Sequence, residues 1–335
     1  MNMTTSQTTN PITPPRARNL VIGMSWGLAL DDLLLFSKSL RRFAPEVDIV
    51  LFVKDVTVEA QRLALKLNIQ LLPLTSCYYG MCRSSAKREF KASVKRIRNY
   101  VGLRLFRLLF SASRPLLRLG YTREEFGQLQ RETNKLVCHT YSSRFVQYYD
   151  YLKNQELRYE KVMLTDVRDV CFQADPFAAV PADQLWMFQE EGPATLGTEK
   201  RNGQWIKATF GSRVLRQIAE HRILCAGITI GGYKNILGYL QTMEPHLLTR
   251  TPVYIPDQGI HNALAYTGAF NHLNPVIRKN GEGPVLTVGL MNKQTMILNA
   301  EGRLVDSQGK PYAVIHQYDR HEYLIPHLKK LAGNG

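Results

Sequence analysis

Two carboxylates, Asp166 and Asp169, closely follow the short apolar run 162–164. Short apolar runs are typical of buried strands, so we expect both side chains at the carboxyl end of a strand, where open α/β sheets bind ligands. Carboxylate oxygens are hard ligands that suit Mg²⁺ or Mn²⁺, and either ion can hold a diphosphate. The pattern therefore indicates chemistry on an activated phosphate ester. The simpler alternative is a solvated turn in which Arg168 pairs with one of the carboxylates.

The elements that must position these carboxylates begin near the amino terminus. Apolar runs predict strands at 19–24, 47–53 and 69–72, and helical spacing predicts helices at 30–42 and 57–67. This alternation is typical of a parallel sheet with helices on its faces. Later helices are predicted at 135–157 and 233–243, and later apolar or strand-like runs at 185–188, 223–230, 285–290, 295–298 and 312–315. The expected fold class is α/β and Rossmann-like, with a mostly parallel central sheet and flanking helices.

The basic charge of the chain is concentrated in one segment. The 335 residues carry a formal net charge of +15, and residues 83–123 hold twelve basic residues against a single acid, Glu89. Apolar residues recur in this segment at helical spacing, as in a basic amphipathic helix. We expect a basic helical insertion at about 78–130 that binds an anionic membrane surface, with packing on the core as the alternative. Nucleic acid is not an expected partner, because the aromatic interleaving and the motif spacings of nucleic-acid binders are lacking.

The length of 335 residues allows one large or two ordinary domains, and an apolar content of 44% is typical of a globular protein. No run approaches about 18 consecutive apolar residues, so no transmembrane helix is expected. Residues 1–18 are polar and proline-rich, and we expect a disordered leader ahead of a single domain at 19–335. The five cysteines are odd in number and scattered, which favours reduced thiols. The expected location is the cytoplasm, with peripheral membrane association through the basic segment.

Three later stretches carry residues that could join the carboxylates. The predicted strand 223–230 contains Gly227, where a ligand can approach the backbone closely; Asp257-Gln258 and then His316 follow. This combined order resembles the GT-A superfamily of nucleotide-sugar glycosyltransferases, and its hexosyltransferase-like members in particular. In that family a strand ends in a DxD-type metal motif, which TDVRD resembles with an extra residue between the carboxylates. Cys225 stands where the family's N-A-G strand has Asn.

The resemblance implies a role for each of these residues. The metal ligands would be Asp166, Asp169 and His316, with Mn²⁺ or Mg²⁺ as the cofactor. The donor contacts would come from Ser25, Trp26, Lys54, Arg144, Gly227 and Arg320. An inverting enzyme needs an Asp or Glu as general base near the acceptor hydroxyl. Glu190, Glu191 and Asp257 are available, and we predict Asp257 and Glu191. Retaining relatives show no obvious base, so the stereochemistry stays open, with retention slightly favoured. The implied activity is transfer of a hexose from a nucleotide-diphosphate sugar, expected to be UDP-linked, to a hydroxyl of a lipid-linked or cell-envelope glycan.

Two other classes of function stay open. A nucleotidyltransferase or a phosphohydrolase also pairs carboxylates with Mg²⁺. Nucleotidyltransferases usually carry a basic residue in a glycine-rich loop after the first strand, and the loop 23–27 has none. A non-catalytic peripheral membrane protein would use the carboxylates only to stabilise its fold, and it would not respond to metal and nucleotide together.

Overall fold

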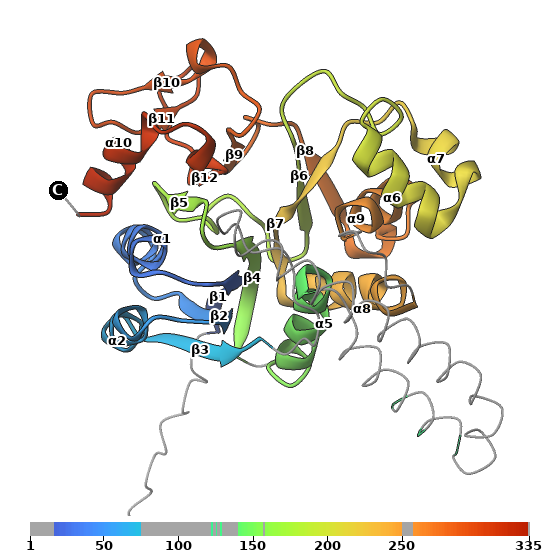
Figure 1. Ribbon diagram of the computed structural model, residues 1–335, viewed down its shortest axis with the longest axis horizontal. Helices are drawn as coiled ribbons and strands as arrows, with labels where there is room; N and C mark the ends of the chain where they lie inside the picture. Colours follow the sequence, from blue (N-terminus) through green and yellow to red (C-terminus); the bar gives the residue numbers. More distant parts are fainter. Residues whose placement is uncertain are drawn as a thin grey trace, which may run out of the picture.

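A computed structural model describes residues 17–74, 122, 125, 128, 140–156, 158–249 and 257–333. The predictions for the leader and for the basic segment 83–123 fall almost entirely outside these residues and stay predictions. The described chain folds into a central sheet with helices on both faces and a smaller sheet beside it (Figure 1). The predicted α/β class, with a mostly parallel central sheet, is confirmed.

The central sheet has seven strands in the order β3-β2-β1-β4-β7-β6-β8. Their bounds are β1 (Arg18–Trp26), β2 (Asp48–Lys54), β3 (Ile69–Pro73), β4 (Tyr159–Asp166), β6 (Leu185–Gln189), β7 (Leu224–Gly232) and β8 (Pro275–Arg278). β7 pairs antiparallel with both β4 and β6, and the other pairings are parallel. One edge of the sheet therefore collects the carboxyl ends of β1, β2, β4 and β6 together with the amino end of β7.

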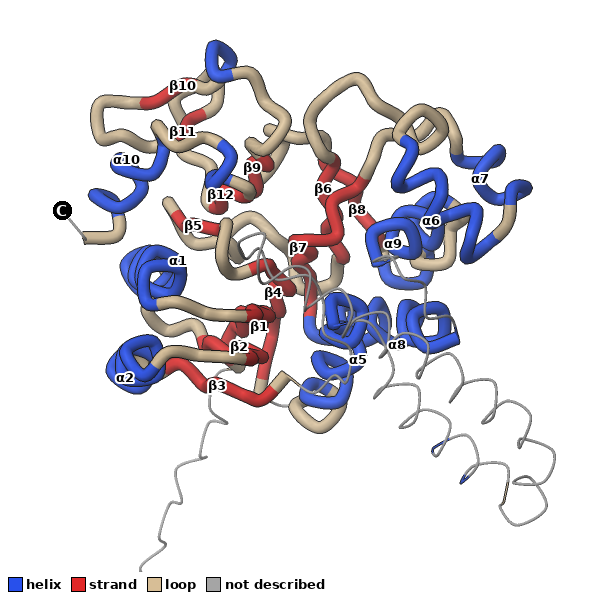
Figure 2. The backbone as a smooth tube through the Cα atoms, in the orientation of Figure 1, coloured by secondary structure: helices blue, strands red, loops and turns tan. Residues whose placement is uncertain are grey.

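The helices cover both faces of this sheet (Figure 2). α1 (Leu30–Phe43) and α2 (Val58–Lys66) lie on one side, and α5 (Thr140–Leu152), α8 (Tyr233–Thr249) and α9 (Asp257–Tyr266) lie on the other. Side chains alternate between the faces of a strand, so Val21 of β1 packs with the first helices and Leu20 and Ile22 pack with the second group. This double burial explains why the middle of β1, residues 20–24, is apolar.

A helical lobe and a second sheet complete the described chain. α6 (Lys200–Phe210) and α7 (Ser212–Ile218) pack beside α9. The second sheet has the order β5-β12-β9, with β5 (Val170–Phe172), β12 (Val314–His316) and β9 (Val285–Thr287). Near it lie the hairpin β10 (Ile297–Leu298) and β11 (Leu304–Val305), the terminal helix α10 (Leu324–Leu331), and the short 3-10 helices at Lys293–Thr295 and Tyr318–Arg320. A third 3-10 helix, Asn271–Leu273, packs against α8. β12 runs antiparallel to β5 and parallel to β9.

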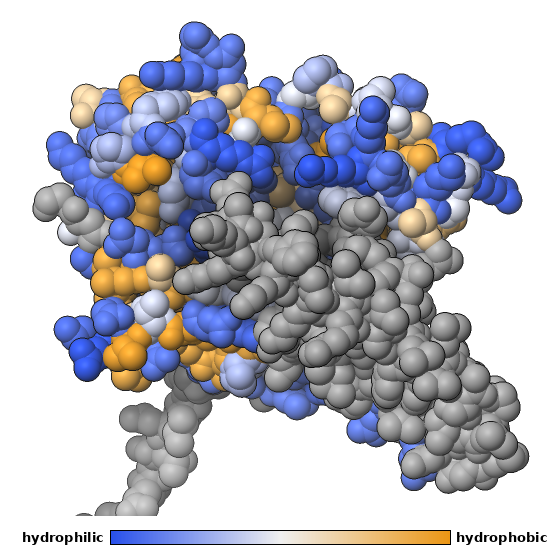
Figure 3. All heavy atoms as spheres, in the orientation of Figure 1, coloured by the Kyte–Doolittle hydropathy of each residue, from blue (hydrophilic) through white to orange (hydrophobic). Residues whose placement is uncertain are grey.

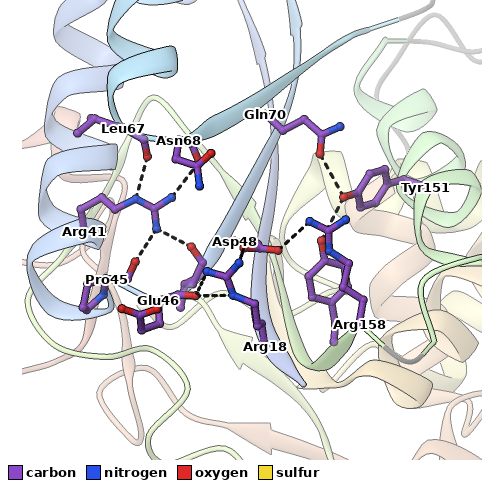
Figure 4. A network of polar contacts seen from close by, with 12 residues as sticks. Arg18, Arg41, Pro45, Glu46, Asp48, Leu67, Asn68, Gln70, Tyr151 and Arg158 are labelled. Atoms are coloured by element: carbon purple, nitrogen blue, oxygen red, sulfur yellow. Dashed lines mark hydrogen bonds and ion pairs between the residues drawn. The ribbon is translucent and has the colours of Figure 1, made fainter. Parts of the chain in front are cut away.

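Arginine side chains link several elements at the opposite edge of the sheet, away from the carboxyl ends of β1, β2, β4 and β6 (Figure 4). Asp48, at the start of β2, forms ion pairs with Arg18 at 2.8 Å and with Arg158 at 3.1 Å. Arg41, near the end of α1, donates to four backbone carbonyls, those of residues 45, 47, 67 and 68, at 2.5 to 3.1 Å. These contacts join the amino ends of β1 and β2, the segment entering β4, and the ends of α1 and α2.

The surface drawn in Figure 3 is mostly hydrophilic, with hydrophobic residues reaching it mainly on the α1 and α2 side. Two of the exposed apolar side chains belong to α2, where Val58 is 56% and Leu65 is 81% exposed. Among the described residues, no helix combines the length and the apolar character that a bilayer crossing requires.

Candidate metal centre and active site

The two carboxylates occupy the predicted position at a strand end. Asp166 is the last residue of β4, and Asp169 lies in the turn before β5. Arg168, between them, turns away and pairs with Asp32 of α1 at 3.1 Å. Neither carboxylate is therefore neutralised by its neighbour in sequence, and the simple turn in which Arg168 pairs with one of them does not form.

Strand pairing brings His316 to these carboxylates from about 150 residues further along the chain. In the β5–β12 ladder His316 lies opposite Val170, the residue after Asp169, and the Gln317 amide donates to the Asp169 carbonyl at 2.7 Å. His316 Nε2 lies 3.5 Å from Asp166 Oδ2 and 4.0 Å from Asp169 Oδ2. Ligand atoms of the three side chains all lie within 4.8 Å of one another.

The imidazole of His316 is arranged as in a metal ligand. His316 is fully buried, and its Nε2 makes no hydrogen bond although it faces two carboxylates. Its Nδ1 lies 3.4 Å from the Thr287 hydroxyl and 3.7 Å from the Cys225 thiol. A ligating histidine commonly fixes its tautomer through the nitrogen that does not bind the metal. These residues therefore fit a divalent cation held between Nε2 and the two carboxylates.

Gly227 forms the wall of this centre. It belongs to β7, and the register that pairs Thr165 with Ile228 places Gly227 beside Asp166. A Cβ atom at Gly227 would lie 2.6 Å from Asp166 Oδ2 and 2.9 Å from His316 Nε2, closer than real Cβ contacts. The absence of a side chain is thus what allows these two ligands to approach each other.

Arg144, in the first turns of α5, supports the metal centre by pairing with Asp166. Its guanidinium is buried, pairs with Asp166, donates to Asp257 Oδ2 at 3.1 Å and reaches the Ala226 carbonyl at 3.3 Å. Burial acts to lower the pKa of Arg144, but the two carboxylates outweigh it and raise that pKa. The arginine is therefore a permanent cation that fixes two acidic side chains.

The three candidate ligands differ in their electrostatics. Burial acts to raise the pKa of Asp166, but Arg144 and His316 outweigh it and lower the pKa to about 2. Burial, together with the charge of Asp166, raises the pKa of Asp169 to about 6 although His316 opposes the shift. Burial acts against protonation of His316, but Cys225 and the carboxylates raise its pKa well above the usual value. Without a metal, these carboxylates stabilise a proton on His316, and a bound divalent cation would displace that proton.

The predicted donor contacts lie on the same edge of the sheet. Ser25 and Trp26 end β1, and Lys54 ends β2, with its Nζ 4.7 Å from the centroid of the Trp26 ring. Ser25 is buried and its hydroxyl makes no hydrogen bond. Arg320 is exposed in the 3-10 helix that follows β12. Of the predicted donor contacts, Arg144 and Gly227 contact the metal centre, and the other four lie on the elements around it.

The three acidic candidates for catalysis occupy different surroundings. Asp257 begins α9 and is buried, with Oδ1 accepting from the Gln258 amide at 2.9 Å and Oδ2 bound to Arg144. Glu191 is exposed and accepts from Asn280 Nδ2 at 3.1 Å. Glu190 is half-buried and accepts from Gln258 Nε2 at 3.3 Å. Asp257 therefore has a partner on each oxygen, and Glu191 is held by a surface contact.

Sequence reasoning did not identify two residues that support the site, Thr287 and Asn262. Thr287, which ends β9, reaches the imidazole through the β9–β12 pairing. Asn262 of α9 fixes the start of β7, because its side chain exchanges hydrogen bonds of 2.7 and 2.8 Å with the backbone of Leu224. Asn262 is i+4 from Gln258, and this helical spacing is the one signal that could have linked it to the site.

Comparisons with known proteins give likenesses only at the level of the fold. No protein-family model matches the sequence, and no curated protein matches it. The chain is similar to the apo structure of the bifunctional glycosyltransferase WbbM, with a TM-score of 0.45, 12% identity and coverage of 97% of this chain and 53% of that one. It is also similar to the galactosyltransferase LgtC in complex with donor and acceptor sugar analogues, with a TM-score of 0.40, 14% identity and coverage of 94% and 95%. The chain spans about half the length of WbbM, and at these scores the function has to be argued from the site itself.

Proposed function

We propose that the protein is a metal-dependent glycosyltransferase of the GT-A type, which moves a hexose from a nucleotide-diphosphate sugar to an acceptor hydroxyl. The observation that carries the proposal is the centre formed by Asp166, Asp169 and His316 at the carboxyl edge of the sheet. This edge is where open α/β sheets bind nucleotides. The unpartnered Nε2 of His316 and the space left by Gly227 both favour a cation there.

The donor set fits a hard divalent cation. Two carboxylates and one imidazole suit Mn²⁺ or Mg²⁺, and the remaining positions would be open to diphosphate oxygens. When bound, the cation supplies charge that stabilises a departing diphosphate. Arg144 contributes by holding Asp166 in a fixed orientation, so that this ligand needs no reorganisation during the reaction.

The remaining residues of the edge complete the proposed donor site. Trp26 and Ser25 are proposed to contact the base and ribose, with UDP as the expected nucleotide, and Lys54 and Arg320 are proposed to contact the diphosphate. Asp257 keeps its proposed place beside the acceptor, where its ion pair with Arg144 favours a positioning role. A lipid-linked or cell-envelope glycan remains the proposed acceptor, with the basic segment 83–123 at an anionic membrane surface in the cytoplasm.

The proposal is tested by thermal unfolding with UDP, GDP, CDP or ADP, each in Mn²⁺, Mg²⁺ or EDTA. One nucleotide is expected to raise the melting temperature only when a metal is present. Asp169→Ala should abolish that increase without changing the melting temperature in EDTA by a comparable amount. Asp183→Ala, an exposed residue before β6 at the other end of the sheet, serves as the control and should respond as the wild type does.

The same panel extended to nucleoside triphosphates, together with an assay of phosphate release, separates the rival functions. Stabilisation by nucleoside triphosphates and metal, with no response to diphosphates, would contradict sugar transfer and favour a nucleotidyltransferase. Release of inorganic phosphate from simple esters would favour a phosphohydrolase. An Asp169→Ala variant that keeps the full metal-dependent response would show that the ligands are wrongly assigned.

A further inference from the structure

Glu190 lies at the carboxyl edge of the sheet but is outside the metal centre. It directly follows β6, which runs in the same direction as β4, so it emerges at the edge where Asp166 ends β4. Its amide donates to the Ile223 carbonyl at 2.9 Å, which fixes the backbone there. The group of metal-ligating atoms found among the described residues contains Asp166, Asp169 and His316 but not Glu190.

The carboxylate of Glu190 faces the site rather than the solvent. One oxygen accepts from Gln258 Nε2 at 3.3 Å, and the Cys225 thiol is also within hydrogen-bonding reach of the carboxylate. Cys225 in turn lies 3.7 Å from His316 Nδ1. The charges of His316 and Arg320 both act on the carboxylate as well. Glu190 is therefore linked through Cys225 to the Nδ1 side of His316, whereas the two aspartates face Nε2.

Counting hydrogen-bond acceptors distinguishes Glu190 from the other acids of the site. Asp166 and Asp169 belong to the metal centre, Asp257 has a partner on each oxygen, and Glu191 is exposed. An ionised carboxylate offers about four acceptor positions. Gln258 and the Cys225 thiol account for two of them on Glu190, so about two positions remain for a bound molecule. A half-buried carboxylate that still has acceptor positions to offer suits a ligand that carries hydrogen-bond donors.

The pair of Glu190 and Gln258 fits a polyol. A carboxylate accepts from hydroxyl groups, and the amide of Gln258 has a carbonyl oxygen in addition to the Nε2 that it gives to Glu190. Neighbouring hydroxyls of a hexose could engage both side chains at once. Gln258 itself is fixed in the first turn of α9, where its backbone carbonyl accepts a hydrogen bond from Asn262 Nδ2 at 2.8 Å. Its side-chain carbonyl is not used in this contact.

We propose that Glu190 is a sugar-specificity residue of this site, whose carboxylate, held by Gln258, accepts hydrogen bonds from hexose hydroxyls. The inference rests on the proposed function and extends it, because it assigns recognition of the sugar to a residue separate from the metal and nucleotide contacts. The hydroxyls can belong to the hexose of the donor or to the acceptor glycan, and the two sources are separated by the experiment.

The experiment compares Glu190→Gln with Glu160→Gln, an exposed glutamate at the other end of the sheet on β4. Calorimetry with Mn²⁺ measures binding of the nucleoside diphosphate that stabilises the wild type, and then of its hexose conjugates. In the donor arm, Glu190→Gln should bind the free diphosphate as the wild type does and lose about tenfold or more in affinity for the preferred conjugate. In the acceptor arm, donor affinity should be kept and the acceptor KM should rise by about tenfold or more.

Several results would overturn the inference. One is a Glu190→Gln variant that matches Glu160→Gln in both arms. Another is an equal loss of affinity for the free diphosphate and for its hexose conjugate, because that result would indicate a role in the fold or the metal centre instead of sugar binding. If Glu191→Gln lost affinity for the sugar and Glu190→Gln did not, the residue that recognises the sugar would be Glu191 and not Glu190. A wild type that binds no nucleotide with metal would refute the proposed function itself, a distinguishable result.

Discussion

Gly227→Ala is the substitution that most directly tests whether the metal centre is built as described. The new Cβ would lie 2.6 Å from Asp166 Oδ2, 2.7 Å from His316 Cε1 and 2.9 Å from His316 Nε2. Ordinary van der Waals contact begins near 3.4 Å, so one or both ligands must retreat by roughly 0.5 to 0.8 Å. A metal site tolerates deviations of only about 0.2 Å from its preferred ligand distances.

The expected consequence is a large loss of metal affinity together with a loss of stability. Changes to residues that merely support ligands cost about 10- to 100-fold in metal affinity, and this change displaces the ligands themselves. We therefore expect Mn²⁺ affinity to fall by about 100-fold. Forcing one extra methyl group into a packed site costs about 1–3 kcal/mol in the free energy of unfolding.

The assay is a Mn²⁺ titration followed by calorimetry, with unfolding in EDTA measured separately. Gly203→Ala is the matched control, because Gly203 lies in α6 and the nearest atom to its added Cβ is the Leu196 carbonyl oxygen at 3.2 Å. The control should bind Mn²⁺ as the wild type does. If Gly227→Ala also binds Mn²⁺ with wild-type affinity, the ligand set is not the one inferred from this geometry.

Three further predictions concern the support of the site and the fold. Arg144→Met leaves the buried Asp257 without its counter-charge, so denaturant titration should show a loss of about 3–5 kcal/mol in unfolding free energy; an unchanged midpoint would contradict this. Burial lowers the pKa of His261 from 6.5 to about 3, so the unfolded state binds the proton more readily and stability should fall as pH drops below 6.5, by about 2 kcal/mol at pH 5. His261→Gln should flatten that pH dependence, and an equal slope in both proteins would refute the assignment. Arg41→Met removes the donor to four carbonyls and should cost about 2–4 kcal/mol, whereas the exposed Arg62→Met should cost little.

The amino-terminal half of the sheet was predictable because its local signals agree. Strands predicted at 19–24, 47–53 and 69–72 are β1, β2 and β3, since each is an apolar run ended by polar or turn residues. The helices α6 and α7 were not predicted. The buried residues of α6 are Asn202, Gly203 and Ile206, which do not form an apolar stripe, so its position is set by packing against α9.

The residue types of the site could be predicted from the sequence, but the contacts between those residues could not. The strand end that carries Asp166 follows from the apolar run before it. The distance between Asp169 and His316 depends on the β5–β12 register, and spacing along the chain cannot reveal that pairing. Glu190 and Glu191 are neighbours whose environments differ, because one contacts Gln258 and the other contacts Asn280. Which glutamate faces the site is decided by the packing of α9, which local sequence does not report.

The order in which the ligands occur along the chain has a consequence for biosynthesis. Two of them are present once the polypeptide reaches residue 169, but the third is at residue 316, on a strand that pairs with residues 170–172. A ribosome must therefore translate 147 residues beyond Asp169 before the cation can be captured with its full set of ligands. A product that ends between residues 169 and 313 keeps the Asp166 strand but lacks β12, so it has neither the third ligand nor the strand that pairs with β5.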